Sequence, residues 1–255
     1  MNADARHAAI VAALHQRGRV NVNELAEAHG VTVETIRRDL TALDQAGALR
    51  KVHGGAVPAV SPAPESAADE REHTNAAAKL AIANAALKAL ELKTGATLLL
   101  DAGSSVAALA RLLPEDQDLT VITNSVLIAA EAATHQGVRV HILGGQVRGI
   151  TQAAVGAQTV ATLSRLRADV AVLGANGLSL NHGLSTPEQE EAAVKMAITA
   201  AGRKVVALVD ATKFGQEHLV SFARLDDVDL LVTDANPPEP LRQQLASTGC
   251  EVLQA

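Results

Sequence analysis

With 255 residues, of which 48% are hydrophobic and 20% charged, the chain has the composition of a folded protein with one large domain or two modest ones. It contains no run of roughly 18 or more apolar residues, which excludes a membrane-spanning chain, and its apolar content excludes a fully disordered one. The formal net charge of -6 is unevenly divided, because residues 1–57 hold 7 basic and 6 acidic side chains whereas residues 58–255 hold 15 and 22.

The scarcity of aromatic residues excludes one way of binding nucleic acid. The chain has no Trp, no Tyr and only Phe214 and Phe222. Proteins that bind single strands or RNA commonly stack the bases on aromatic side chains. Recognition of that kind is therefore not expected here.

The first residues lack the apolar core of a secretory signal, and Cys250, the one cysteine, cannot form an internal disulfide. We therefore expect a protein of the cytoplasm. Cys250 itself is expected to be a small buried hydrophobic residue.

A change of composition predicts two domains. Residues 58–75 contain three prolines and no apolar side chain larger than valine, which is typical of an exposed, semi-rigid linker. This segment could be partly helical after Pro64, but it cannot form a core. We predict one domain over residues 1–57, a linker over residues 58–75 and a second domain over residues 76–255.

Three helices are predicted in the first domain. The first ends at Gly18, the second is capped by Asn23 and ends at Gly30, and the third spans residues 33–46 with Thr32 as its cap. Apolar side chains repeat along them with the helical period and are expected to form a small core. The residues of this core are Ile10, Val11, Leu14, Leu25, Ala28, Val33, Ile36, Leu40 and Leu43.

Two short extended segments complete the first domain. Residues 20–22 form a brief extended piece. Residues 49–57 alternate apolar and polar side chains around the turn signal Gly54-Gly55, which predicts a small β-hairpin, or wing.

The second and third helices are close enough in sequence to form a helix-turn-helix, in which the later helix enters the major groove of DNA. Once its apolar stripe is buried, that helix exposes hydroxyl groups and two guanidinium groups, which can bind guanine or phosphate through paired hydrogen bonds. The candidate DNA contacts are Thr32, Glu34, Thr35, Arg37, Arg38 and Thr41 on the helix and Arg50, Lys51 and His53 in the wing. The alternative is a helical bundle used for dimerisation, with Arg37 and Arg38 paired to Asp39 or Asp44 on a solvated face.

The second domain alternates buried strands with alanine-rich helices. The predicted strands are residues 97–100, 120–123, 138–143, 169–173, 204–209 and 230–233, and the predicted helices include residues 76–92, 126–134 and 188–201. Strands that are apolar on both faces and joined by helices predict an α/β fold with a mainly parallel sheet.

Small and polar residues follow the predicted strands. After the first strand, Gly103, Ser104 and Ser105 precede a helix, a combination that suits phosphate binding, although Ser104 could simply cap the helix. Ligands of open parallel sheets bind beyond the carboxyl ends of the strands. We therefore expect residues after several strands to converge on one anionic, hydroxylated ligand. These further residues are Asp101, Thr123, Asn124, Gly144, Gly145, Arg148, Asn176, Asp210 and Lys213.

Three carboxylates, Asp101, Glu191 and Asp210, could serve as the general base of a sugar-phosphate isomerase. They could equally bind sugar hydroxyls or brace the loops, and Glu191 with Lys195 could be an ordinary surface pair one helical turn apart. A metabolic enzyme has no use for an appended DNA-reading domain. No catalytic residue is therefore predicted.

The nine histidines form no metal-ligand pair, apart from His135 and His141, which lie on either side of a turn. We predict neither a metal nor a cofactor.

Two segments of the first domain, residues 35–40 (Thr-Ile-Arg-Arg-Asp-Leu) and residues 53–56 (His-Gly-Gly-Ala), closely resemble the N-terminal winged helix-turn-helix of the DeoR family of bacterial repressors. Thr32 stands where many members have serine, and either residue can cap the helix.

The second domain resembles the effector-sensing domain of the same family over its whole length. The matching pieces include Asp101-x-Gly103-Ser104-Ser105, residues 191–195 and Asp210-x-x-Lys213. This resemblance implies a relative of the ribose-5-phosphate isomerase fold that senses phosphorylated sugars, and it adds Glu191 and Lys195 to the candidate effector-binding residues. Ser105 stands where the family usually has threonine.

Within the family, residues 147–153, 169–177 and 182–187 most resemble actinobacterial regulators of sugar phosphotransferase and fructose-utilisation genes. The resemblance implies a transcriptional repressor that binds double-stranded operator DNA as a homodimer or homotetramer. A phosphorylated sugar, with fructose 1-phosphate as the first candidate, would release it. The alternative is a phosphosugar isomerase-like enzyme whose N-terminal domain only mediates assembly.

Overall fold

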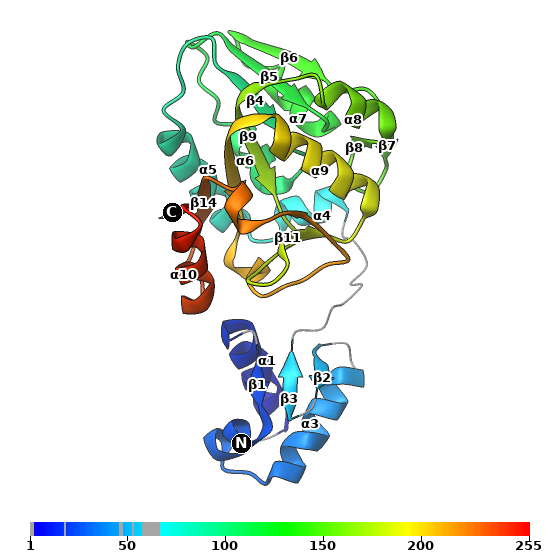
Figure 1. Ribbon diagram of the computed structural model, residues 1–255, viewed down its shortest axis with the longest axis vertical. Helices are drawn as coiled ribbons and strands as arrows, with labels where there is room; N and C mark the ends of the chain where they lie inside the picture. Colours follow the sequence, from blue (N-terminus) through cyan, green and yellow to red (C-terminus); the bar gives the residue numbers. More distant parts are fainter. Residues whose placement is uncertain (1–2, 18, 46–47, 53, 58–66) are drawn as a thin grey trace.

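The computed structural model describes residues 3–17, 19–45, 48–52, 54–57 and 67–255, which form a small N-terminal unit and a larger α/β unit (Figure 1). Several predicted features lie outside the described residues: the helix stops at Gly18 and Gly47, the wing residue His53, and residues 58–66 of the predicted linker.

The N-terminal unit contains the three expected helices, α1 (Ala3–Arg17), α2 (Val22–His29) and α3 (Val33–Gln45). Gly30 ends α2 in the left-handed conformation, with φ of 63°. The helix cap differs from the prediction. Asn21, and not Asn23, caps α2, because the helix begins directly after an extended residue and the Asn21 side chain accepts the N–H of Asn23 at 2.8 Å.

One compact apolar cluster holds these helices together. Its buried members come from all three helices and from the short strands and their flanks. Of the predicted core residues, Val11 and Val33 are only partly buried against this cluster and Ala28 is exposed, while Ala26 of the same helix is buried instead. They are Ile10, Leu14, Val20, Val22, Leu25, Ala26, Ile36, Leu40, Leu43, Leu49 and Ala56.

The wing is a three-stranded sheet. Strands β2 (Arg50–Val52) and β3 (Gly55–Val57) form the predicted antiparallel hairpin, and β1 (Val20–Asn21) adds to β3 as a third strand. A side chain at Gly55 would bring its Cβ to 1.9 Å from the carbonyl oxygen of Val20. The close approach of β1 to β3 therefore requires glycine at this position.

The larger unit is built on a seven-stranded parallel sheet, which confirms the predicted α/β class. In spatial order its strands are β15 (Glu251–Gln254), β14 (Leu230–Thr233), β12 (Gly202–Leu208), β9 (Ala168–Gly174), β4 (Thr97–Leu100), β5 (Leu119–Thr123) and β6 (Val138–Ile142). The strand order reverses between β4 and β9, so the loops that follow these two central strands diverge and leave space above the sheet.

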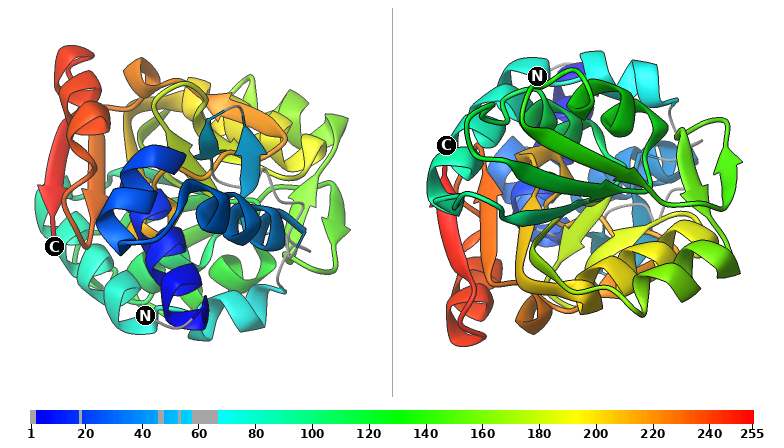
Figure 2. Two further views of the ribbon diagram at one scale, coloured as in Figure 1. Left: turned by 90° about the horizontal axis from the view of Figure 1, so that it is seen from below. Right: turned by 90° about the horizontal axis from the view of Figure 1, so that it is seen from above.

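Helices cover both faces of this sheet (Figure 2, right). One face packs against α5 (Ala76–Leu90), α6 (Ser104–Ala110) and α7 (Val126–Ala132). The other face packs against α8 (Ala157–Leu163), α9 (Gln189–Ala201) and α10 (Glu239–Ser247). Successive residues of β4 illustrate the arrangement, because Leu98 and Leu100 belong to the first core and Leu99 to the second. Cys250 is buried in the second core as expected, and burial raises the pKa of its thiol to about 11.

Two small sheets were not predicted. Strands β10 (Gly177–Ser179), β11 (Gly183–Thr186) and β13 (Val220–Ala223) form one, and β7 (Gln146–Arg148) pairs with β8 (Ala153–Val155) in the other. Two single-turn helices, η1 (Ala211–Lys213) and η2 (Leu225–Asp227), lie beside them in sequence. Of these pieces, η1 contributes Lys213 to the lining of the cavity at the carboxyl end of the main sheet.

Residues 68–73 of the predicted linker form a short helix, α4 (Ala68–His73). The Ala68 N–H donates to the carbonyl of Ile150 at 2.8 Å, and Glu72 forms an ion pair with Arg111 of the segment after α6. The end of the predicted linker therefore packs on the larger unit. None of the described helices has the length and apolar character needed to span a membrane.

Candidate functional site

The exposed face of α3 carries the predicted DNA-contacting side chains. The side chains of Arg37 and Arg38 are 60% and 81% exposed, and each lies within 4 Å of Glu34. The Thr32 hydroxyl accepts the Thr35 N–H at 3.2 Å and caps the helix as predicted. Both guanidinium groups are therefore available on the first turns of the helix.

The wing lies against this face of α3. The Lys51 ammonium donates to the Thr41 hydroxyl at 2.8 Å, and the Lys51 backbone N–H donates to the Asp44 carboxylate at 3.3 Å. Arg50 on the same strand is exposed. Helix and wing therefore present one continuous polar and basic surface.

The ion pairing differs from the one expected for a dimerisation bundle. Asp39 does not face Arg37 or Arg38 but is buried. Its carboxylate accepts two hydrogen bonds from the Arg6 guanidinium group, at 2.6 and 3.0 Å, and lies 2.9 Å from the His7 Nε2. The hydrogen bond from Arg6 lowers the pKa of Asp39 below its usual value. Asp39 thus joins α1 to α3, and the two arginines remain on the exposed face.

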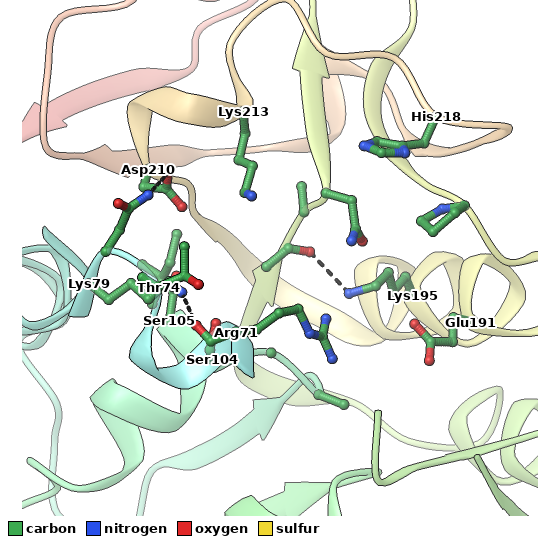
Figure 3. A pocket seen from close by; sticks show the side chains of 18 residues that line it. Arg71, Thr74, Lys79, Ser104, Ser105, Glu191, Lys195, Asp210, Lys213 and His218 are labelled. Atoms are coloured by element: carbon green, nitrogen blue, oxygen red, sulfur yellow. Dashed lines mark hydrogen bonds between the residues drawn. The ribbon is translucent and has the colours of Figure 1, made fainter. Parts of the chain in front are cut away.

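A cavity of about 210 Å³ opens at the carboxyl end of the main sheet, where α4 and α5 meet the loops after β4, β9 and β12 (Figure 3). Basic, acidic and hydroxyl groups line it. The residues around it are Arg71, Thr74, Asn75, Lys79, Ala102, Gly103, Ser104, Ser105, Gly174, Ala175, Asn176, Pro187, Glu191, Lys195, Leu208, Asp210, Lys213 and His218.

Many of the predicted effector-binding residues meet at this cavity. Those that line it are Gly103, Ser104, Ser105, Asn176, Glu191, Lys195, Asp210 and Lys213. They come from four separate stretches of the chain, three that follow strands of the main sheet and one at the start of α9.

Asp101 lies behind the cavity wall and is paired with Lys195. The Asp101 carboxylate accepts hydrogen bonds from the Lys195 ammonium and, at 3.2 Å, from the Gly174 N–H. The Lys195 ammonium also donates to the Gly174 carbonyl at 3.0 Å and lies 5.2 Å from the ring centre of Phe222. Burial raises the pKa of Asp101, and the charge of Lys195 opposes that shift.

Glu191 has different partners from those of a surface helix pair. Its side chain accepts hydrogen bonds from Arg148 and from the Thr151 hydroxyl, and both Glu191 and Lys195 are buried. The interpretation of these two residues as an exposed pair one turn apart is therefore wrong. Arg148 does not line the cavity as predicted but supports Glu191 from the β7–β8 side.

Other predicted residues brace the loops instead of facing the cavity. The Asn124 side chain accepts the Ala102 N–H at 3.1 Å and donates to the Ala154 carbonyl at 3.2 Å, while Thr123 is fully buried. Gly144 and Gly145 pack against Thr159, whose hydroxyl donates to the Gly144 carbonyl at 2.7 Å. These residues hold the strand ends in place and do not line the cavity.

Several lining residues were missed at the sequence level. Arg71 and Thr74 fall in the predicted linker, so they were not considered for a site. Lys79 is buried in the first turns of α5 and donates to the carbonyls of Arg71 and Thr74. Burial lowers the pKa of Lys79 and also that of His218. The run of charged residues directly after the proline-rich segment could have indicated a helix here, and with it the lining residue Arg71.

Two cations in the cavity stand out because no described residue forms an ion pair with them. The Lys213 side chain is half-buried and makes no hydrogen bond or ion pair with any described residue. The Nε of Arg71 is fully buried and likewise has no hydrogen-bond partner in the described structure. Figure 3 shows both side chains pointing into the cavity. Within the described residues, no group of three His, Cys, Asp or Glu side chains is arranged to hold a metal ion.

The arrangement suits binding of an anion that also carries hydroxyl groups. Unpaired cations beside Ser104 and Ser105 can bind phosphate oxygens, and the Asn176 amide and Asp210 carboxylate can bind hydroxyls. Asp101 and Glu191 already accept several hydrogen bonds, and so does Asp210, from Thr212 and Asn75. These hydrogen bonds hold the three carboxylates in fixed positions.

Comparison with known proteins supplies the family. Residues 6–61 match the DeoR-like helix-turn-helix domain, and residues 74–235 match the DeoR C terminal sensor domain. The HTH-type transcriptional regulator GlpR of Haloferax volcanii is 34% identical over 91% of this chain and 90% of its own length. The glycerol-3-phosphate regulon repressor of Escherichia coli (strain K12) is 31% identical over 96% of each chain.

Among solved structures, ribose 5-phosphate isomerase A of Methanocaldococcus jannaschii aligns with 55% of each chain, at 20% identity and a TM-score of 0.41. The relatives that match along the whole chain are named as regulators and repressors, not as enzymes. The chain therefore belongs to the DeoR family of DNA-binding transcriptional regulators.

Proposed function

We propose that this regulator represses genes for the uptake and breakdown of a sugar and leaves its operator when a phosphorylated sugar binds. In this proposal residues 1–57 bind the operator and residues 76–255 bind the effector. A similar protein from Escherichia coli carries the name of a glycerol-3-phosphate regulon repressor, which fits control by a phosphorylated metabolite.

The observation that carries the proposal is the unpaired ammonium group of Lys213 in a cavity that also presents the hydroxyls of Ser104 and Ser105. A half-buried ammonium group without a partner among the described residues keeps its hydrogen-bond donors free for an anion. A sugar phosphate supplies that anion and the hydroxyls that Asn176 and Asp210 can bind. The resemblance to regulators of fructose-utilisation genes makes fructose 1-phosphate the first candidate.

Operator binding is proposed to use two copies of α3, one in each half-site, so the active species is a homodimer or homotetramer. A ligand shifts an equilibrium only through its differential affinity for the two states. The sugar phosphate must therefore bind more tightly to an arrangement of the DNA-binding units that does not fit the operator.

A gel-shift experiment with the DNA upstream of the chain's own gene tests this function. The fragment is mixed with the protein alone and with fructose 1-phosphate, fructose 6-phosphate, glycerol 3-phosphate or ribose 5-phosphate. The expected result is a shifted band that one of these compounds, and not the free sugar, abolishes. A band that no sugar phosphate affects, together with no binding of any of them to the protein, would contradict the proposal.

The variant Lys213→Ala sharpens this test. Loss of a charge-assisted contact is expected to weaken sugar-phosphate binding by about tenfold or more while operator binding without ligand stays unchanged. The variant then remains on DNA at concentrations that release the wild type. Lys204→Ala, which removes a lysine that does not line the cavity, is the matched control.

A further inference from the structure

Helix α4 contributes residues to the cavity and also lies in the segment of the chain that joins the two units. Arg71 and Thr74, at and just after the end of α4, line the cavity. In the sequence, residues 58–67 alone separate the end of β3 from the start of α4. Ten residues span at most about 35 Å when fully extended. The position of α4 therefore limits where the DNA-binding unit can lie.

Apart from its hydrogen bonds with Lys79 and Ile150, only weak forces hold α4 on the sensor domain. Its sequence, Ala-Asp-Glu-Arg-Glu-His, contains no apolar side chain larger than alanine, so little hydrophobic burial fixes it. Its ion pair between Glu72 and Arg111 joins side chains that are 37% and 42% exposed, and such pairs contribute about 0–1 kcal/mol. A helix this short is also unstable by itself. A new contact to α4 can therefore change its position or its population.

One strong polar element connects α4 to the core. Lys79 of α5 is buried and donates to the carbonyls of Arg71 and Thr74, which fixes the backbone at the end of the helix. The same two residues face the cavity with their side chains. The end of α4 is thus held on one side by Lys79 and is open to a ligand on the other.

The guanidinium group of Arg71 is the part of α4 that is ready for such a ligand. Its Nε is fully buried without a partner, and no described residue forms an ion pair with this side chain. Lys195, Lys79 and Glu191 in the same cavity all have partners of their own. Arg71 and Lys213 are long side chains that point into one cavity, so both can turn toward an anion that enters between them (Figure 3).

We propose that Arg71 binds the phosphate of the effector and that this contact fixes α4 against the sensor domain, making α4 the element that carries the signal to the DNA-binding unit. The inference rests on the proposed function, because it requires that a sugar phosphate binds in this cavity. A phosphate held by Arg71 and Lys213 joins α4 to η1 across the cavity. The bound phosphate thereby restricts α4 to fewer positions than in the free protein. The DNA-binding units can then no longer adopt the spacing that suits the operator.

The experiment compares the wild type, Arg71→Ala, Arg71→Lys and the control Glu70→Ala, which changes an exposed residue of the same helix that does not line the cavity. The probe is whichever compound of the sugar-phosphate panel binds the wild type most tightly. Ligand affinity is measured by calorimetry, and amide hydrogen exchange is measured over residues 68–75 with and without saturating ligand. The reporting amides include those of Arg71 and Thr74, which bond to the carbonyls of Ala67 and Glu70.

Saturating ligand is expected to slow exchange of these amides in the wild type and in Glu70→Ala. Arg71→Ala is expected to bind the ligand about tenfold more weakly and, even when saturated, to show no slowing at α4 and incomplete release from DNA. Arg71→Lys retains a charge and is expected to recover part of the affinity. If saturated Arg71→Ala protects α4 and releases DNA as the wild type does, Arg71 is not the connection.

Failure of the proposed function gives a different result. In that case no sugar phosphate binds the wild type at all, and exchange at α4 does not respond in any variant. Both the function and the inference are then overturned. Binding to the wild type with an unchanged exchange rate at α4 overturns the inference alone.

Discussion

Several buried charged side chains of this protein are stabilised by specific protein partners in place of water. Asp39 faces Arg6 and His7, Asp101 faces Lys195, and Lys79 faces two backbone carbonyls. Removing one member of such a pair leaves the other charge or polar group buried and unsatisfied, which costs more than the pair contributes. The residues that support the two sites should therefore respond strongly to single substitutions and weakly to paired ones.

The Asp101–Lys195 pair gives the clearest case, because its side chains are only 1% and 5% exposed. Lys195→Met is expected to destabilise the protein by about 3–5 kcal/mol, since the Asp101 carboxylate is left buried without its cation. The double variant Asp101→Asn, Lys195→Met is expected to recover much of that loss. Urea unfolding of the wild type, both single variants and the double variant measures the coupling. Additive losses would mean that the two side chains act independently.

Asp39 predicts a pH dependence for the N-terminal unit. Arg6 lowers the pKa of Asp39 in the folded state, whereas the unfolded value is about 3.9. The stabilisation is therefore complete above roughly pH 4–5 and is lost as the pH falls through the lower folded pKa. We expect Asp39→Asn to lower the unfolding midpoint of this unit at pH 7, and the difference from the wild type to shrink at pH 3. An equal difference at both pH values would exclude the ion pair as its cause.

Helix α3 has one face that packs into the core and an opposite face that is exposed to solvent. Ile36, Asp39 and Leu40 hold it to the core, and Arg37 and Arg38 lie between them on the opposite face. Because the buried contacts use other residues, a substitution on the exposed face should leave the fold unchanged.

Arg37→Ala should therefore weaken operator binding by about 1–3 kcal/mol, roughly five- to 150-fold, if the guanidinium group contacts a base. Sugar-phosphate binding and the unfolding midpoint should not change. Gel shifts and calorimetry on the same preparation measure both affinities, with Arg139→Ala, an exposed arginine on β6, as the control. Equal loss of DNA and sugar-phosphate binding would mean that the DNA-binding surface lies elsewhere.

Elements with a strong local pattern were predictable and those fixed by distant contacts were not. Six of the seven strands of the main sheet follow from their apolar runs, and the stripe of α3 follows from the helical period. The seventh strand, β15, is half-exposed and was not predicted. Helix α4 has no apolar stripe, and β10, β11 and β13 are short segments that pair over long sequence distances. Position after a strand likewise did not distinguish Lys213, which lines the cavity, from Asn124, which braces the loop beside it.

For the whole molecule, the uneven division of charge separates a DNA-reading unit from an acidic body. Residues 58–255 carry 15 basic and 22 acidic side chains, an excess of acid that residues 1–57 do not share. Repulsion between this body and the DNA backbone should limit binding away from the operator, and salt should screen it over about 10 Å at 0.1 M and about 30 Å at 0.01 M.

Reversal of the acidic charge tests this effect at a place remote from both sites. Glu115 and Asp116 are exposed and line neither the cavity nor the α3 surface. The double variant Glu115→Lys, Asp116→Lys should bind random-sequence DNA several-fold more tightly than the wild type at about 0.01 M salt, with the difference vanishing above about 0.2 M as screening increases. Sugar-phosphate affinity should not change, and Glu115→Gln, Asp116→Asn should lie between the two. Fluorescence anisotropy against salt concentration measures all three proteins. If the curves coincide at every salt concentration, the acidic body does not oppose non-specific binding, and discrimination must come from the contacts of α3 and the wing alone.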